Sequence, residues 1–239
     1  FRGGVRLQVP PQFFERGVCH EDVQLTPAQI ETISSTTQTR LQHVDALVAD
    51  RQWDEAIDTL LDLLEEGDAG LVEVSAGRYT GLGEHCHRLI ANLPADGLAQ
   101  YRGRVDPLAE TWYQKALRTR DEAQLRRLVQ QMFCSAWGDD ALLALGEMAL
   151  EAGRYDEARV AWQCISPSLR SPAGRPTWIA LADINLDAHA NRIAQAWHAD
   201  NTSPDWLVYP DTDLDLATVR ARLVLASIRA EEFSRARRE

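Results

Sequence analysis

Lysine is almost absent from this chain of 239 residues, because Lys115 is the only one and arginine supplies the other basic side chains. The 36 acidic residues outnumber the 25 basic ones, which gives a formal net charge of −11. A net negative field opposes non-specific binding to nucleic acid and to anionic lipid, since both depend on clustered Lys and Arg. No basic stripe with interleaved aromatic residues is present either, so the sequence predicts no nucleic-acid partner.

Long apolar runs and paired cysteines are also missing. No run of 18 apolar residues exists, which argues against a transmembrane segment. The four cysteines, Cys19, Cys86, Cys134 and Cys164, form no Cys-x-x-Cys pair, and this excludes the usual zinc-ribbon, thioredoxin and c-type haem motifs. We expect them to be small buried side chains. If the protein is exported, one disulfide is an alternative, and the sequence does not choose its pairing.

What the sequence does contain is hydrophobic periodicity of three and four residues, which predicts an all-α protein with almost no strand signal. Thr26, as N-cap before Pro27, predicts the start of one helix, or two in series, that ends near Asp50. Asp121 and Asp139 are predicted N-caps of later helices. Further helices are predicted over 53–66, 83–92, 97–119, 121–134, 138–152, 155–165, 214–230 and from 232 onward.

These elements divide the chain into four parts. We predict an extended N-terminal arm (1–25), a helical region (26–166), a loop-rich segment with one candidate helix at 186–199 (167–212) and a helical hairpin (213–239). The stretch 71–79 is predicted to be an extended link.

A short pattern occurs three times, each time where a helix follows another helix. An aromatic residue is followed three residues later by alanine, in the pairs Trp53 and Ala56, Tyr155 and Ala158, and Phe233 and Ala236. The middle copy is the fullest, because it adds Leu145, Gly146, Gly153 and Trp162. This resembles the tetratricopeptide repeat (TPR), a helix pair that recurs every 34 residues.

The residue types in this pattern suit helix packing and require no reactive group. Gly146 and Ala158 lack bulk, so two helices can approach closely, while Tyr155 and Trp162 fill space and Gly153 permits the turn. The copies are irregularly spaced, so we predict TPR-like hairpins stacked as an irregular α-solenoid. The sequence stops a few residues into the second helix of the third hairpin, and such a short helix is unstable alone. It also begins without Met. We therefore expect a processed protein or an excised piece, which forms the N-terminal part of a longer protein.

Four longer stretches together resemble one family. They are 86–94, 101–113, 133–150 and 209–228, and they are similar to the N-terminal helical region of planctomycete proteins that continue into a PQQ-like (quinoprotein-type) β-propeller. The likeness covers most of residues 38–239, and VPPQF at 9–13 resembles the start of the mature chain after a signal peptide. The resemblance implies export to the periplasm or cell envelope and a propeller beyond residue 239. It transfers no catalytic residue and no cofactor.

Two clusters invite a metal site. His85, Cys86 and His87 are consecutive, with Cys19 and His20 as further candidate ligands, but residues i and i+2 of a helix point about 200° apart, so the two histidines cannot share one ion. The acidic stretch at 211–215 mimics half of an EF-hand loop, without the later Gly and Glu. We favour an acidic N-terminus for the helix that follows. The sequence predicts no metal and no cofactor.

Charge is distributed unevenly, and this suggests where contacts form. Residues 45–73 hold ten acids and one base, while 102–127 hold seven bases and four acids. Solvated helix faces explain this, and the alternative is a complementary contact between helix layers or subunits. Aromatic residues beside arginines are typical of protein interfaces. We predict a partner surface made of Trp112, Tyr113, Arg118, Arg120, Arg126 and Arg127.

The sequence therefore favours a non-catalytic helical-repeat scaffold, or protein-interaction module, in a larger exported envelope protein. It would bind a protein partner or its own propeller. One alternative is an accessory domain of a quinoprotein-like oxidoreductase whose catalytic propeller lies beyond residue 239. Another is a cytoplasmic adaptor that binds peptides in a TPR-like groove.

Overall fold

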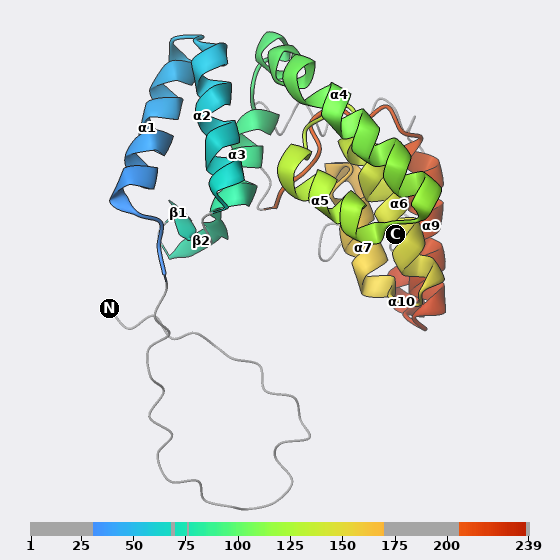
Figure 1. The fold of residues 1–239 in the computed structure, drawn as a ribbon. Helices are drawn as coiled ribbons and strands as arrows, with labels where there is room; N and C mark the ends of the chain where they lie inside the picture. The colour runs from blue at the N-terminus through green and yellow to red at the C-terminus, as the bar shows by residue number, and fades with distance from the viewer. Residues whose placement is uncertain (1–30, 68–69, 76, 170–205, 238–239) are drawn as a thin grey trace, which may run out of the picture. The chain divides into compact units, whose positions relative to one another are not determined.

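A computed structural model shows a chain built mostly of α-helices, which confirms the predicted all-α class (Figure 1). The structure describes residues 31–67, 70–75, 77–169 and 206–237. The predicted arm at 1–25, the Thr26 cap and the candidate helix at 186–199 lie outside these residues.

The first two helices form a hairpin. Helix α1 spans Ser35–Ala49 and α2 spans Trp53–Glu66. The Ser34 side chain caps α1, because its oxygen accepts a hydrogen bond from the Thr37 N–H at 3.1 Å. Leu60 and Ile57 of α2 are fully buried against α1 and the following helices.

Of the helix, or two in series, predicted from Thr26 to near Asp50, the described residues confirm α1 but are not helical at 31–33. Residues 31–33 pair with Leu71 instead, because the Ile33 N–H donates to the Leu71 carbonyl at 3.2 Å and the Leu71 N–H donates to that of Glu31 at 3.1 Å. Gly70 makes this approach possible, since a Cβ there would lie 2.9 Å from the Ile33 Cα.

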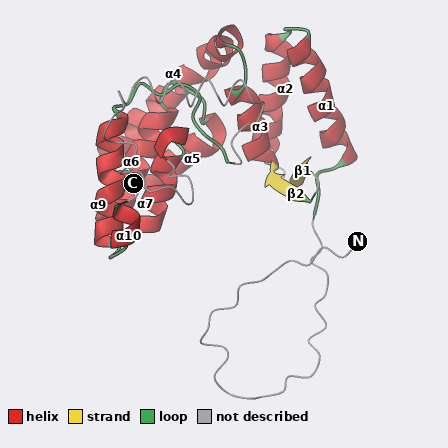
Figure 2. Cartoon of the chain, turned by 180° about the vertical axis from the view of Figure 1, so that it is seen from behind, coloured by secondary structure: helices red, strands yellow, loops and turns green. Residues whose placement is uncertain are grey.

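The predicted extended link at 71–79 is part of a small β-hairpin, whose pairing the sequence did not predict (Figure 2). Strand β1, Leu71–Ser75, pairs antiparallel with β2, Arg78–Gly81. The short turn at Gly77, with φ of 76°, lets the two strands pair. Both strands pack against helix α3, Leu82–Ala91.

Helix α4 spans Ala95–Thr119 and begins directly after Pro94. Helix α5, Glu122–Met132, begins after Asp121, whose side chain accepts a hydrogen bond from the Gln124 N–H at 3.0 Å, which confirms the predicted N-cap. Helices α6, Gly138–Glu151, and α7, Tyr155–Gln163, follow and pack together. A 3-10 turn, η2, spans Pro167–Leu169.

Asp139 is not the N-cap that the sequence predicted. Helix α6 begins one residue earlier, and the buried Asp139 carboxylate instead accepts a hydrogen bond from the Thr212 hydroxyl at 2.7 Å. The same carboxylate also accepts from the Asp140 N–H at 3.0 Å, so it joins the start of α6 to the segment at Thr212.

The described part ends with α9, Leu216–Arg229, and α10, Phe233–Ala236. Among the described helices, contacts follow the chain: α4 packs on α5, α5 on α6, α6 on α7, α7 on α9 and α9 on α10. Figure 1 shows α6, α7 and α9 side by side.

Four helix-to-helix turns share one backbone conformation. A residue two positions before the next helix is left-handed in each, with φ of 60° at Arg51, 51° at Arg120, 76° at Gly153 and 61° at Glu231. The N–H of the following residue donates to a carbonyl five residues back, at 2.8 to 2.9 Å. This is the Schellman arrangement, for which glycine is the usual residue. Only one of the four turns has it.

The cost of this conformation gives a pair of predictions with opposite signs. A left-handed L-residue is disfavoured by about 1–2 kcal/mol. Gly153→Ala should therefore lower the free energy of unfolding by about 1 kcal/mol. Arg51→Gly should raise it by only about 0.5 kcal/mol, because the greater conformational freedom of glycine in the unfolded chain offsets part of the relieved strain. Urea unfolding of both variants measures this. Changes of the same sign would contradict it.

Acidic and basic segments meet across α2 and α4. Arg104 of α4 forms an ion pair with Asp54 at 2.8 Å and another with Asp58. The uneven charge therefore includes a contact between helices, in addition to solvated faces.

Candidate interaction surfaces

The predicted partner surface lies on α4, the turn after it and α5, and its aromatic residues are already in contact with neighbours. The Arg127 guanidinium lies over the Trp112 ring, 4.7 Å from its centroid. Tyr113 packs against Trp137, with ring centroids 5.2 Å apart. The side chains of Trp112, Tyr113 and Trp137 are half-buried, and that of Arg127 is exposed.

The arginines of this surface bind acids of the same chain. Arg126 binds Glu122 at 2.5 Å and Glu157 at 2.7 Å, which ties α5 to α7. Arg120 pairs with Glu151. The Arg154 guanidinium, and after it that of Arg126, hold the pKa of Glu122 below its usual range through hydrogen bonds. Arg118 donates to the Gln114 carbonyl at 3.3 Å. A partner would have to compete with these contacts, so the surface stays a prediction.

The residues of the repeated pattern lie where helices approach each other. A Cβ on Gly146 would lie 2.1 Å from Nε1 of Trp162, whose side chain is fully buried and donates to the Leu143 carbonyl at 3.2 Å. Trp53 lies against α4, 3.3 Å from the position of a Cβ on Gly97. Ala56, Leu145 and Ala158 are buried, Tyr155 and Ala236 are half-buried, and Phe233 is exposed.

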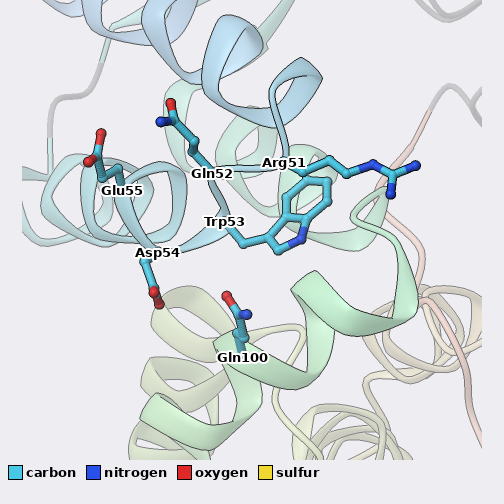
Figure 3. Close-up of a pocket in the computed structure, with 6 residues that line it drawn as sticks. All are labelled: Arg51, Gln52, Trp53, Asp54, Glu55 and Gln100. Carbon is cyan, nitrogen blue, oxygen red and sulfur yellow. The ribbon is translucent and has the colours of Figure 1, made fainter.

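A shallow pocket of about 250 Å³ lies at the α1–α2 turn (Figure 3). In Figure 3 the Arg51 side chain runs beside the Trp53 indole, and Gln100 of α4 points toward the turn. Its other lining residues are Gln52, Asp54 and Glu55. The volume is below the roughly 300–1,000 Å³ of typical small-molecule sites, and its charges are mixed. It makes a poor ligand cavity.

The three residues of the His-Cys-His cluster, 85–87, lie in helix α3 and do not form one common site. Cys86 and His87 are buried while His85 is half-buried, and no group of three candidate metal ligands occurs in the part of the chain that the structure describes. Cys19 and His20 lie outside that part. Burial raises the pKa of the Cys86 thiol to about 12, so it is not a thiolate at neutral pH.

His87 has a structural role that the sequence did not predict. Its Nε2 lies 2.8 Å from the Gln130 carbonyl, which selects the neutral tautomer that donates there. The ring also lies against Phe133, with centroids 5.9 Å apart. Burial lowers the pKa of His87 to about 4, although the Gln130 hydrogen bond acts in the opposite direction.

This pKa predicts a loss of stability in mild acid. Between pH 6.5 and about 4 the unfolded chain binds a proton at His87 that the folded chain does not. The contribution is therefore present above pH 6.5 and is lost as the pH falls toward 4. We expect His87→Gln, whose amide can still donate to Gln130, to lose less stability over this range than the wild type in urea unfolding. Parallel pH profiles would contradict the prediction.

An unpredicted polar contact fixes residues 209–212 to the helices. Arg102 of α4 donates to Asp211 at 2.8 Å, to the Tyr209 hydroxyl at 3.0 Å and to the Cys134 carbonyl at 3.1 Å. The Tyr209 hydroxyl in turn donates to the Ser135 carbonyl at 2.8 Å. The acidic stretch therefore serves two contacts: Asp211 binds Arg102, and Asp215 is the N-cap of α9, whose N-terminus the sequence predicted to be acidic.

Arg159 joins the α6–α7 hairpin to the next one. Its side chain is only 3% exposed, and it binds Asp156 at 2.6 Å, Glu232 at 3.0 Å and the Ser227 hydroxyl at 3.2 Å. The sequence contained a signal for it, because Arg159 stands four residues after Tyr155 as Arg237 stands four after Phe233.

Comparisons with protein families, with curated proteins and with solved structures found no match to this chain. None of the helices in the described part of the chain has the length and apolarity that a membrane-spanning helix needs.

Proposed function

We propose that this chain is a non-catalytic scaffold, a protein-interaction module in which TPR-like hairpins are stacked as an irregular α-solenoid. The observation that supports it best is the left-handed turn repeated at Arg51, Arg120, Gly153 and Glu231, with the same hydrogen bond in each. Stacked helical hairpins would use one turn geometry repeatedly, and here it recurs although three of the four residues are not glycine.

The order of contacts supports the same proposal. In the described helices from α4 onward, the principal contacts join each helix to the next. Repeat proteins are built in this way, and they use their extended surfaces to bind other proteins.

The side chains that are chemically most reactive are buried or form contacts within the chain. Cys86 and His87 are buried, Asp139 accepts from Thr212, and Arg159 lies in an ion-pair network. This favours a binding role over a catalytic one. The wider proposal, of an exported protein that continues into a propeller, rests on the family resemblance of the sequence.

A photo-crosslinking experiment in the cells that make the protein tests the binding role. A photoreactive residue would replace exposed Gln42 on α1, Leu117 on α4 or Leu225 on α9, one at a time. We expect a protein adduct of defined mass, or a defined intramolecular crosslink to a propeller, from at least one position. No adduct from any position, together with turnover of a small molecule by the protein, would overturn the proposal.

A further inference from the structure

Three large apolar side chains on the α9–α10 hairpin face solvent. Leu225 is 42% exposed, Ile228 46% and Phe233 60%. Leu225 and Ile228 lie three residues apart and therefore share one face of α9. Phe233 opens α10, which packs against α9.

The repeated turn places this hairpin in register with α6–α7. Aligning left-handed Glu231 with left-handed Gly153 matches Phe233 with Tyr155 and Arg237 with Arg159. On the first helix of each hairpin, the same register matches the residues at 225 and 228 with those at 147 and 150.

In α6–α7 two of the four matched positions, Glu147 and Arg159, contact the hairpin that follows. Glu147 binds Arg222 of α9, with 2.8 Å between Oε1 and Nε. Arg159 binds Glu232 and Ser227. Leu150 and Tyr155 are half-buried and pack against the core. The face is therefore an established helix-docking interface in one hairpin and solvent-exposed in the other.

Differences between the two faces indicate what would cover the exposed one. Arg237 repeats Arg159, so its partner carries a carboxylate where Glu232 stands. Leu225 replaces the Glu147 that binds Arg222, so the partner presents an apolar side chain there rather than an arginine. The partner would also need a small residue opposite Phe233, because Trp53, which holds the same place in its hairpin, packs against Gly97.

We propose that the face formed by Leu225, Ile228, Phe233 and Arg237 docks a helical hairpin of a partner protein. That hairpin has an apolar first helix and a carboxylate at the start of its second. The proposal rests on the proposed function and adds the surface and the chemistry of the partner. The contact would continue the α7–α9 interface by one further hairpin.

A labelled synthetic peptide with the sequence of residues 213–237 and the change Arg222→Leu is the probe, because α9–α10 itself docks on α6–α7 and leucine supplies the apolar side chain expected opposite Leu225. Its binding to the full chain would be measured by fluorescence anisotropy. We expect Leu225→Glu and Arg237→Glu in the chain each to weaken binding about tenfold. A probe with Glu232→Arg should restore binding to the Arg237→Glu chain.

Val160→Glu is the matched control, since Val160 is 63% exposed on α7 and lies outside this face. Circular dichroism would show that all three variants stay folded. Absence of probe binding, or equal weakening by Val160→Glu, would overturn the inference. A chain dimer in sedimentation that Leu225→Glu abolishes would overturn it too, because the occupant would then be a second copy. Photo-crosslinks from Gln42 or Leu117 alone would leave the proposed function standing while this surface failed.

Discussion

Gly146→Ala is expected to lower the free energy of unfolding by about 2–3 kcal/mol, because overpacking a filled core costs this much. The added methyl would lie 2.1 Å from Nε1 and 2.4 Å from Cε2 of Trp162. Trp162 is fully buried and cannot swing toward solvent. Its movement would also break the hydrogen bond to the Leu143 carbonyl and separate α6 from α7.

Gly103→Ala is the control for this prediction, measured by urea unfolding alongside it. Gly103 lies inside α4, where a Cβ would meet nothing within 4 Å. Alanine there should raise stability by about 0.5–1 kcal/mol through helix propensity alone. The smaller ring in Trp162→Phe should recover part of the Gly146→Ala loss. Equal changes in the free energy of unfolding for Gly103→Ala and Gly146→Ala would show that the close contact between Gly146 and Trp162 does not affect stability.

Gly138→Ala is expected to cost more, about 3 kcal/mol or above, because the clash is with backbone. A Cβ there would lie 1.9 Å from the Phe133 carbonyl oxygen and 3.0 Å from Cε2 of Tyr209. The link between α5 and α6 would have to move. It would carry with it the Ser135 carbonyl that accepts from the Tyr209 hydroxyl.

Tyr209→Phe separates the two consequences of that change. It removes the hydroxyl contacts with Ser135 and Arg102 but keeps the ring, and it should cost only about 1 kcal/mol. Hydrogen exchange should show faster opening around residues 133–138 in Gly138→Ala than in Tyr209→Phe. A Gly138→Ala loss no greater than that of Tyr209→Phe would contradict the predicted backbone shift.

Helix positions were predictable because periodicity and caps act within a few residues. The prediction of 138–152 agrees with α6 at Gly138–Glu151, and Asp121 caps α5 as expected. The errors arose where distant segments compete for the same backbone. Residues 31–33 pair with β1, and β1 pairs with β2, so neither pairing follows from local propensity.

The candidate surfaces divide in the same way. Residue types alone suggested a surface at Trp112 and Arg126, yet their neighbours in space, Arg127 and Glu157, already occupy them. The exposed face at Leu225 and Phe233 was not predicted as a surface, although the repeated aromatic-to-alanine pattern marked its position. The sequence does not show whether an apolar side chain is buried by a neighbouring segment or exposed to solvent.

The sequence by itself determined the helical class, most helix boundaries and the repeated hairpin pattern, because these depend on side-chain spacing and short-range hydrogen bonds. Only the tertiary structure decided that Arg159 is buried between hairpins, that Arg102 binds Asp211 and that the matched face of α9–α10 is exposed. Those outcomes depend on which segments meet in space. A charged or apolar side chain is stabilised or left bare by neighbours that stand tens of residues away along the chain.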